Sequence, residues 1–191
     1  MKNILSTYLK TIDPTIADSI LTDYANAWEK VTVPKKTILT KEGQTQKELL
    51  FVVEGIQKSY YLNDGKEHVI AFTYAPSFSG IPESFFTQSP SNYNLKTISD
   101  SVLLKISYEE HMRFLHEHRP IETLFRIALE HLMGGLVTRH HELMAFSIEE
   151  RFRAFTKRSP HLLNLVPHKD IASYLRIDPS NFSKLMGSVK I

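Results

Sequence analysis

The sequence predicts an α+β protein in which an antiparallel β-roll of the jelly-roll type lies between helical segments. Apolar residues recur at helical spacing over residues 1–30, and short β-branched and aromatic runs separated by turn residues follow over about 31–106. Helical spacing returns at about 107 and continues to the end. A chain of 191 residues suits one large domain, or one medium domain and a small one.

The composition excludes several classes of protein. Hydrophobic residues make up 42% of the chain and charged residues 23%, which favours a packed core over disorder. Because the sequence has no cysteine, disulfides, thiolate metal sites and cysteine nucleophiles are excluded, and a reducing compartment is favoured. The N-terminus does not look like a signal peptide, and no apolar run approaches the roughly 20 residues of a membrane span. We therefore expect a soluble, cytoplasmic protein with no membrane partner.

The N-terminal segment, residues 1–30, is predicted to be helical throughout. Asp13-Pro14 marks a second helix start within it, because proline fits the first position of a helix. The lone Trp28 lies at the end of this pattern beside other aromatic residues and is expected in the core.

Six short runs predict the strands of the β-roll, because β-branched and aromatic residues favour extended backbone. The segment NDGKE at 63–67 predicts a tight hairpin turn, since Asp-Gly tolerates the positive φ that such turns require. Strands at this spacing indicate an antiparallel sandwich or barrel. The six runs are TIL from 37, LLFVV from 49, KSYYL from 58, HVIAFTY from 68, LKTI from 95 and VLLKI from 102.

A long helix is predicted from about Pro120 to 146, after a shorter one that Ser107 caps. Its apolar residues fall at coiled-coil spacing, interrupted by Arg139, and predict a dimer seam. The alternative is that this helix packs only on its own domain. Gly134-Gly135 weakens the helix but lets another backbone come close. The predicted interface residues are Phe125, Leu129, Leu132, Leu136 and Leu143.

The segment PHKDIASYLRIDPSNFSKLMG at 167–187 predicts two short helices with a tight turn between them. Asp178 is a strong N-cap and Pro179 fits the first helical position, so the second helix begins there. One side of this helix is apolar, and the other carries small hydrogen-bonding groups and a lysine, which suit a DNA major groove. The alternative is an ordinary helical hairpin with a solvated face. The candidate DNA contacts are Lys169, Ser180, Asn181, Ser183, Lys184 and Ser188.

The sequence IASYLRIDPSNFSK resembles the helix-turn-helix of the Crp–Fnr transcription regulators, the cyclic-AMP receptor protein and its relatives. Upstream, SIEERFRAF is similar to the connecting helix of one branch, and FVVEG, NDGKE and VLLKIS resemble the cyclic-nucleotide-binding-like β-roll. The resemblance implies a β-roll sensor at 1–118, a long dimerisation helix at 119–146 and a DNA-binding helix-turn-helix domain at 147–191. It also implies a homodimer on double-stranded, pseudo-palindromic DNA, and it brings RNA polymerase into consideration as a partner.

The cyclic-nucleotide cassette of that family is incomplete here. The family holds the ribose with a Gly-Glu pair and the cyclic phosphate with an arginine, but no arginine lies between residues 1 and 112. A buried phosphate without its cation loses a charge-assisted pair, so cyclic AMP is disfavoured. Lys96 could substitute only if it faces inward, which the sequence leaves open. Another small effector, or none, would meet the residues at the corresponding positions, which are Gly80, Ile81, Glu83, Ser91 and Asn92.

The helix-turn-helix departs from the family pattern as well. Arg176 stands at the usual turn glycine, Ser180 replaces a glutamate, and Lys184 replaces an arginine that could grip guanine with two hydrogen bonds. The sequence ends at Ile191, before a full wing. We expect an altered sequence preference and a lower affinity. The alternative reading is a ligand-sensing or scaffolding β-roll dimer with a degenerate DNA reader.

Enzymatic readings have little support, and we expect no catalytic residues, cofactor or metal. A cupin-type metal site needs several convergent histidines, but only His68 lies in the strand region. The run HHELMA lacks the second histidine of a zinc-protease motif, and no phosphate loop or nucleophile elbow is present. Helical histidines could ligate haem or zinc but are expected at the surface or an interface; they are His111, His116, His118 and His131.

Overall fold

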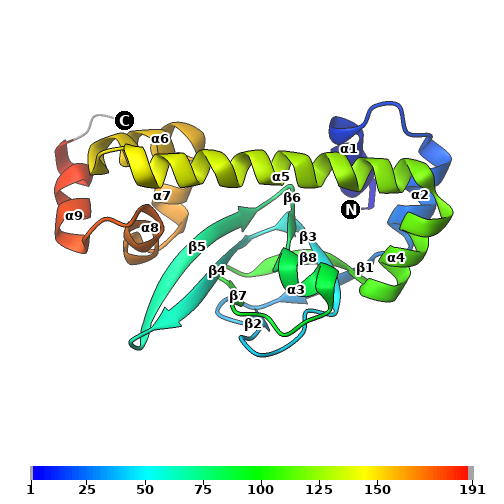
Figure 1. The fold of residues 1–191 in the computed structure, drawn as a ribbon, viewed down its shortest axis with the longest axis horizontal. Helices are drawn as coiled ribbons and strands as arrows, with labels where there is room; N and C mark the ends of the chain where they lie inside the picture. Colours follow the sequence, from blue (N-terminus) through cyan, green and yellow to red (C-terminus); the bar gives the residue numbers. More distant parts are fainter. Residues whose placement is uncertain (1, 189–191) are drawn as a thin grey trace. The chain divides into compact units, whose positions relative to one another are not determined.

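The computed structural model describes residues 2–188 and confirms the predicted α+β fold with an antiparallel β-roll (Figure 1). The chain forms two compact units. The first contains the residues up to Tyr61 together with Ala71–Glu130, and the second contains Leu62–Ile70 and the residues from His131 onward.

The β-roll consists of two four-stranded sheets with the strand orders β1-β8-β3-β6 and β2-β7-β4-β5. In the first sheet, Leu50 and Leu103 point into the roll, whereas the alternate residues Phe51 and Leu104 face the helices. The strands are β1 (Glu29–Val33), β2 (Ile38–Thr40), β3 (Glu48–Glu54), β4 (Ile56–Asn63), β5 (Lys66–Tyr74), β6 (Ser77–Ser79), β7 (Asn94–Thr97) and β8 (Ser101–Ser107).

Helices precede and follow the β-roll in the sequence, and one short helix, α3, lies between the strands β6 and β7. The helices α1, α2, α3 and α4 and the first turns of α5 contribute with the first sheet to an aromatic-rich core. In this core the ring of Tyr24 meets those of Trp28 and Phe114 edge-on. The helices are α1 (Lys2–Ile12), α2 (Asp18–Asn26), α3 (Pro82–Thr87), α4 (Tyr108–Glu117), α5 (Arg119–Ala145), α6 (Ile148–Arg158), α7 (Leu162–Leu165), α8 (His168–Leu175) and α9 (Pro179–Ser188).

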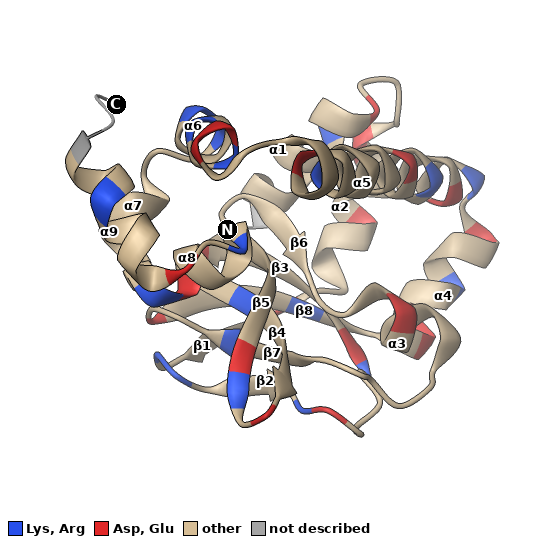
Figure 2. Ribbon diagram, turned by 60° about the vertical axis from the view of Figure 1, so that its left-hand side comes forward, with Lys and Arg blue, Asp and Glu red and all other residues tan. Residues whose placement is uncertain are grey.

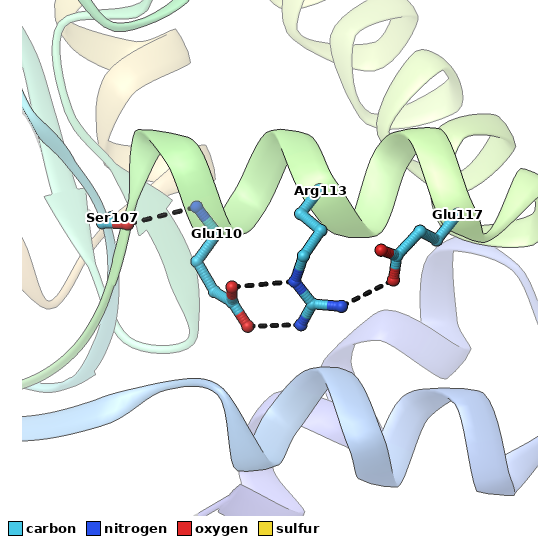
Figure 3. Close-up of polar contacts among 4 residues, drawn as sticks. All are labelled: Ser107, Glu110, Arg113 and Glu117. Carbon is cyan, nitrogen blue, oxygen red and sulfur yellow. Dashed lines mark hydrogen bonds and ion pairs between the residues drawn. The ribbon is translucent and has the colours of Figure 1, made fainter.

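Side-chain caps fix where α4 and α6 begin, and the sequence predicted the cap of α4. The Ser107 hydroxyl accepts a hydrogen bond from the amide of Glu110 at 3.1 Å, and the Glu110 carboxylate then accepts from Arg113 (Figure 3). At α6, Ser147 and Glu150 form a complete capping box. These caps determine the first residue of each of the two helices that flank α5 in the sequence.

The predicted hairpin turn joins β4 to β5. Asp64 and Gly65 have φ angles of 49° and 72°, which is the left-handed conformation expected of both central residues in this turn. The tip of this hairpin, residues 62–70, belongs to the second compact unit although the rest of both strands belongs to the first.

Several elements correct the prediction. Residues 29–30 belong to strand β1 and not to the N-terminal helix. Asp13-Pro14 does not start a helix, because residues 13–17 form a turn and α2 begins at Asp18. The elements β1, β6, α3 and α7 were not predicted. In β1 only Val33 is buried, so its sequence EKVTV lacks the clear alternation of apolar and polar residues by which a strand is predicted. Strand β6 has three residues and α3 has six, which is too short for periodicity to reveal.

His111 also differs from the expected surface or interface position, because it is fully buried in the helical core. Its Nδ1 lies 2.9 Å from the Tyr24 hydroxyl, and its ring centroid lies 4.5 Å from that of Phe125. Burial disfavours the charged imidazolium and lowers the pKa of His111 from 6.5 to about 4. The folded protein therefore holds this imidazole in its neutral form.

The buried His111 predicts a loss of stability in mild acid. His111 binds a proton near pH 6.5 in the unfolded chain but only near pH 4 in the folded protein. The unfolding free energy is therefore not reduced by His111 above pH 6.5, and it decreases as the pH falls from 6.5 to about 4. The loss amounts to about 3 kcal/mol of unfolding free energy. Urea unfolding of wild type and His111→Gln between pH 7 and pH 4.5 measures it, and the variant should show the weaker pH dependence.

His140→Gln is the matched control, because His140 is exposed on α5. It should keep the wild-type pH dependence. Equal pH dependence in wild type and His111→Gln would show that His111 is not the responsible group.

Candidate nucleic-acid interface and β-roll cassette

Helices α8 and α9 meet at a tight turn whose geometry follows from the capping residue predicted for it. The Oδ1 atom of Asp178 accepts from the amide of Ser180 at 2.8 Å and from its hydroxyl at 2.6 Å. These bonds lower the pKa of Asp178 and keep its carboxylate ionised at the helix N-terminus. Proline follows at the first helical position, so α9 begins at the predicted residue.

The inner faces of the two helices are buried as predicted. Ile171 and Leu175 on α8 are fully buried. On α9, Phe182 is 1% exposed, and its ring centroid lies 5.6 Å from those of Phe152 on α6 and His168 on α8. Packing of this one ring therefore determines which side of α9 faces outward.

The outward side of α9 carries the predicted DNA contacts, and Figure 2 shows a basic segment and no acidic one on this helix. Lys169, Asn181 and Lys184 are exposed, and their side chains have no partner within residues 2–188. The hydroxyls of Ser180 and Ser183 are also exposed but donate to Asp178 and to the backbone of α9. Ser188 ends the helix, and its side chain lies outside the described residues.

A buried ionic cluster joins this helical pair to α5. Arg139 donates to the Tyr174 carbonyl of α8 and lies 4.0 Å above the Tyr174 ring. Glu142, 6% exposed, accepts from Arg158 of α6 at 2.7 Å and lies 3.6 Å from Arg139. Burial raises the pKa of Glu142, but the hydrogen bond and the charge of Arg158 lower it by a larger amount. The net shift of this pKa is therefore downward. The residue that interrupts the coiled-coil pattern thus faces α8.

The tip of the β4–β5 hairpin also contacts α8. The Ser173 hydroxyl accepts from the Val69 amide at 3.0 Å and lies 3.2 Å from the Glu67 carbonyl, to which it donates. One side chain of α8 therefore takes the place of a neighbouring strand for two backbone groups of β5. No local pattern in the sequence indicates this contact.

The predicted dimer residues of α5 separate into two groups. Leu129, Leu132 and Leu136 are 41%, 43% and 52% exposed, in agreement with a free apolar face. Phe125 corrects the prediction, because it is 5% exposed and packs in the core of its own unit, while Leu143 is half-buried. The exposed face contains further apolar residues that the heptad pattern missed, namely Met133, Val137 and Met144.

In the β-roll, the Gln46 side chain fills the cassette. Its Oε1 atom accepts from the Ile81 amide at 2.7 Å and from the Thr40 hydroxyl at 3.1 Å, and its Nε2 donates to the Glu48 carbonyl at 2.9 Å. A Cβ atom at Gly80 would lie 2.4 Å from Nε2 of Gln46. The end of the Gln46 side chain therefore packs directly against Gly80.

The other predicted pocket residues take varied positions. The Ile81 side chain belongs to the roll core, and Ser91 is buried with its hydroxyl donating to the Tyr93 carbonyl. Glu83 and Asn92 are exposed. Leu95 points into the roll, so its neighbour Lys96 faces the other side of the sheet and supplies no cation to the cassette.

A pocket of about 280 Å³ has Gln46 among its lining residues. Val31, Leu39 and Leu103 supply apolar lining, and Lys105 and Glu48, which form an ion pair at 2.7 Å, line it as well. Across residues 2–188, no group of three potential ligands could hold a metal ion. None of the described helices is long and apolar enough to cross a membrane.

Residues 30–118 match the family model described as "Cyclic nucleotide-binding domain". No curated protein matches the sequence. Among solved structures, FixK2 from Bradyrhizobium japonicum superimposes with a TM-score of 0.71 at 16% identity, covering 84% of this chain and 83% of its own.

Two further structures cover most of the chain. The c-di-GMP-responsive global regulator CLP of Xanthomonas campestris has a TM-score of 0.68 at 14% identity, with 90% of both chains covered. The catabolite activator protein of Thermus thermophilus has a TM-score of 0.59 at 15% identity, with 93% of this chain and 85% of its own covered. By contrast, this chain spans 44% of the matched cAMP-bound regulatory domain of Toxoplasma gondii PKA.

At these identities the structural matches establish the fold, and the family model establishes the β-roll. Residues 30–118 are thus a cyclic nucleotide-binding-type domain, and the chain has the fold of the Crp/Fnr transcription regulators that its sequence resembles.

Proposed function

We propose that this protein is a DNA-binding transcription regulator of the Crp/Fnr type, without enzymatic activity, that reads DNA with the outward face of α9. One observation carries the proposal. Phe182 is buried, so Asn181 and Lys184 project together from a capped helix with no partner inside the described chain. An amide and a lysine in this setting can reach base edges and phosphates in a major groove.

A second copy of the chain covers the exposed face of α5. Leu129, Leu132 and Leu136 lie there in water, although a packed dimer would bury them. A Cβ atom at Gly134 or Gly135 would meet nothing within 4 Å, so no packing inside the described chain requires these glycines. Pairing of the two helices places two readers on one duplex, about one helical turn apart.

The contacts of α8 supply a route for regulation. Arg139 of α5 holds α8 through the Tyr174 carbonyl, and the β4–β5 hairpin holds it through the hydroxyl of Ser173 on α8. An event in the roll that moves the hairpin changes the position of α8 and so shifts the population between two reader arrangements.

The effector in this proposal is not cyclic AMP. The Ile81 amide already binds Gln46, and the segment from Glu67 to Leu95 contains no lysine or arginine that could pair with a cyclic phosphate. The pocket that Gln46 helps to line, with apolar residues and an ion pair also in its lining, is the better candidate for a small ligand.

The second candidate function is a β-roll dimer that senses a ligand or scaffolds partners and no longer reads DNA. It is favoured by the reader itself, where Ser180 is engaged in the helix cap and a lysine replaces the forked guanidinium of an arginine. DNA binding separates the two functions. A contact with RNA polymerase is expected only if the protein is a DNA-binding transcription regulator.

Combined Asn181→Ala and Lys184→Ala substitution should weaken DNA binding at least tenfold. It removes the Asn181 amide, which can read a base edge, and the Lys184 cation, which can contact a phosphate or a base. Each contact is expected to contribute about 1–3 kcal/mol to the binding free energy. Selection of genomic fragments with purified wild-type protein supplies the site, and titration at two salt concentrations measures affinity and salt slope. A two-fold-symmetric motif is expected.

The control for that experiment is Lys41→Ala with Gln44→Ala, an exposed pair in the β-roll that loses the same charge. It should bind like wild type. Recovery of motif-free DNA, or equal binding by the reader variant, would favour the second function.

Cyclic AMP should leave the melting temperature unchanged. A ligand at one hundred times its Kd would add about 2.7 kcal/mol and raise Tm by roughly 5–10 °C in a chain of this size. Scanning fluorimetry with cyclic AMP, and with cyclic-di-GMP as a second nucleotide, tests this directly. A clear shift with cyclic AMP would overturn the proposal for the effector.

Gln46→Ala should lower the unfolding free energy by about 2–4 kcal/mol, because it strips partners from buried groups that include the Ile81 amide. Gln44→Ala, two residues away and exposed, should change stability by less than about 0.5 kcal/mol. Urea denaturation of both variants compares them. A Gln46 effect as small as that of Gln44 would mean that the side chain does not organise the cassette.

A further inference from the structure

Arg176 occupies a backbone position that disfavours it. Its φ is 53°, in the left-handed region where a Cβ atom is strained and glycine is preferred. The amide of Arg176 donates to the Ser173 carbonyl at 3.1 Å, and that of Ile177 donates to the Ala172 carbonyl at 2.9 Å. These two bonds define a Schellman ending of α8, whose left-handed residue is usually glycine.

The side chain of Arg176 differs from those of the other exposed arginines, because it has no ion-pair partner in the described part of the chain. Leu175 and Ile177, on either side, are 0% and 4% exposed, so the turn is anchored while the guanidinium points to solvent. Nearby Asp178 is occupied by the cap of α9. Every other exposed arginine pairs with a glutamate, as Arg113 does with two (Figure 3), whereas Arg176 has no ion-pair partner within residues 2–188.

Backbone strain and an unpaired charge therefore occur together at Arg176, in the turn that leads into α9. Stability of the isolated chain does not explain an arginine there, because glycine would relieve the strain and no internal contact would be lost. A guanidinium, by contrast, binds phosphate oxygens through two parallel hydrogen bonds. In a docked helix-turn-helix, the N-terminal end of the second helix lies close to the duplex.

We propose that Arg176 is an additional DNA contact that binds a backbone phosphate beside the groove entered by α9. This inference rests on the proposed DNA-reading function and adds to it a residue that carries affinity without sequence preference. The arginine thereby compensates part of the affinity lost where Lys184 stands in place of an arginine.

The test is Arg176→Gly, for which stability and DNA binding should change in opposite directions. Removing the Cβ atom at a positive φ should raise the urea midpoint. Losing one phosphate contact should weaken binding roughly fivefold to tenfold at low salt, reduce the salt slope by about 1 and leave the selected motif unchanged. Arg176→Lys should restore the salt slope but only part of the affinity.

Lys36→Gly is the matched control. Lys36 is an exposed cation at φ 67° in the β1–β2 connection, so this variant relieves the same strain and removes the same charge. It should gain stability and bind DNA like wild type. If Arg176→Gly also binds like wild type while the Asn181 and Lys184 variant does not, the Arg176 assignment is wrong and the proposed function stands.

Two other outcomes also decide the matter. A changed motif in Arg176→Gly would show a base contact and overturn the phosphate assignment. Absence of DNA binding by the wild-type dimer would overturn the proposed function and this inference together.

Discussion

The carboxylate of Glu142, nearly removed from water, is the interaction on which the arrangement of the C-terminal unit depends. It accepts from Arg158 of α6 and lies 3.6 Å from Arg139, whose guanidinium covers Tyr174 of α8. Three helices thus share one charge cluster. Loss of one arginine would leave the Glu142 carboxylate, which is 6% exposed, with a single cation and would weaken the attachment of the three helices to one another. The cluster specifies how α8, and with it α9, attaches to the end of α5.

In the β-roll, one internal side chain satisfies a buried backbone donor. Gln46 gives the Ile81 amide an internal acceptor, and its Nε2 atom packs against Gly80. An uncharged carboxamide satisfies this donor without requiring a nearby cation. The proposal that the effector is not cyclic AMP rests on this occupied donor and on the absence of arginine from residues 1–112.

Prediction from sequence mostly succeeded where a local residue preference decided the structure. Ser107 and Asp178 cap helices at the expected residues, and Asp64-Gly65 forms the expected hairpin. Asp13-Pro14 is the exception, because the helix begins at Asp18 instead. It failed where tertiary contacts decided. A heptad position does not reveal that Phe125 turns into its own core. Gln46 and Ser173 act on partners 35 and over 100 residues away, which no local pattern reports.

The boundary between the two compact units falls inside regular structure. The chain crosses it after Tyr61, after Ile70 and after Glu130, and these crossings lie inside β4, β5 and α5, not in loops. The same three elements therefore supply residues to both units, and no irregular linker joins the units within residues 2–188. A substitution near one of these crossings is expected to affect the stability of both units, because it changes an element that both units contain.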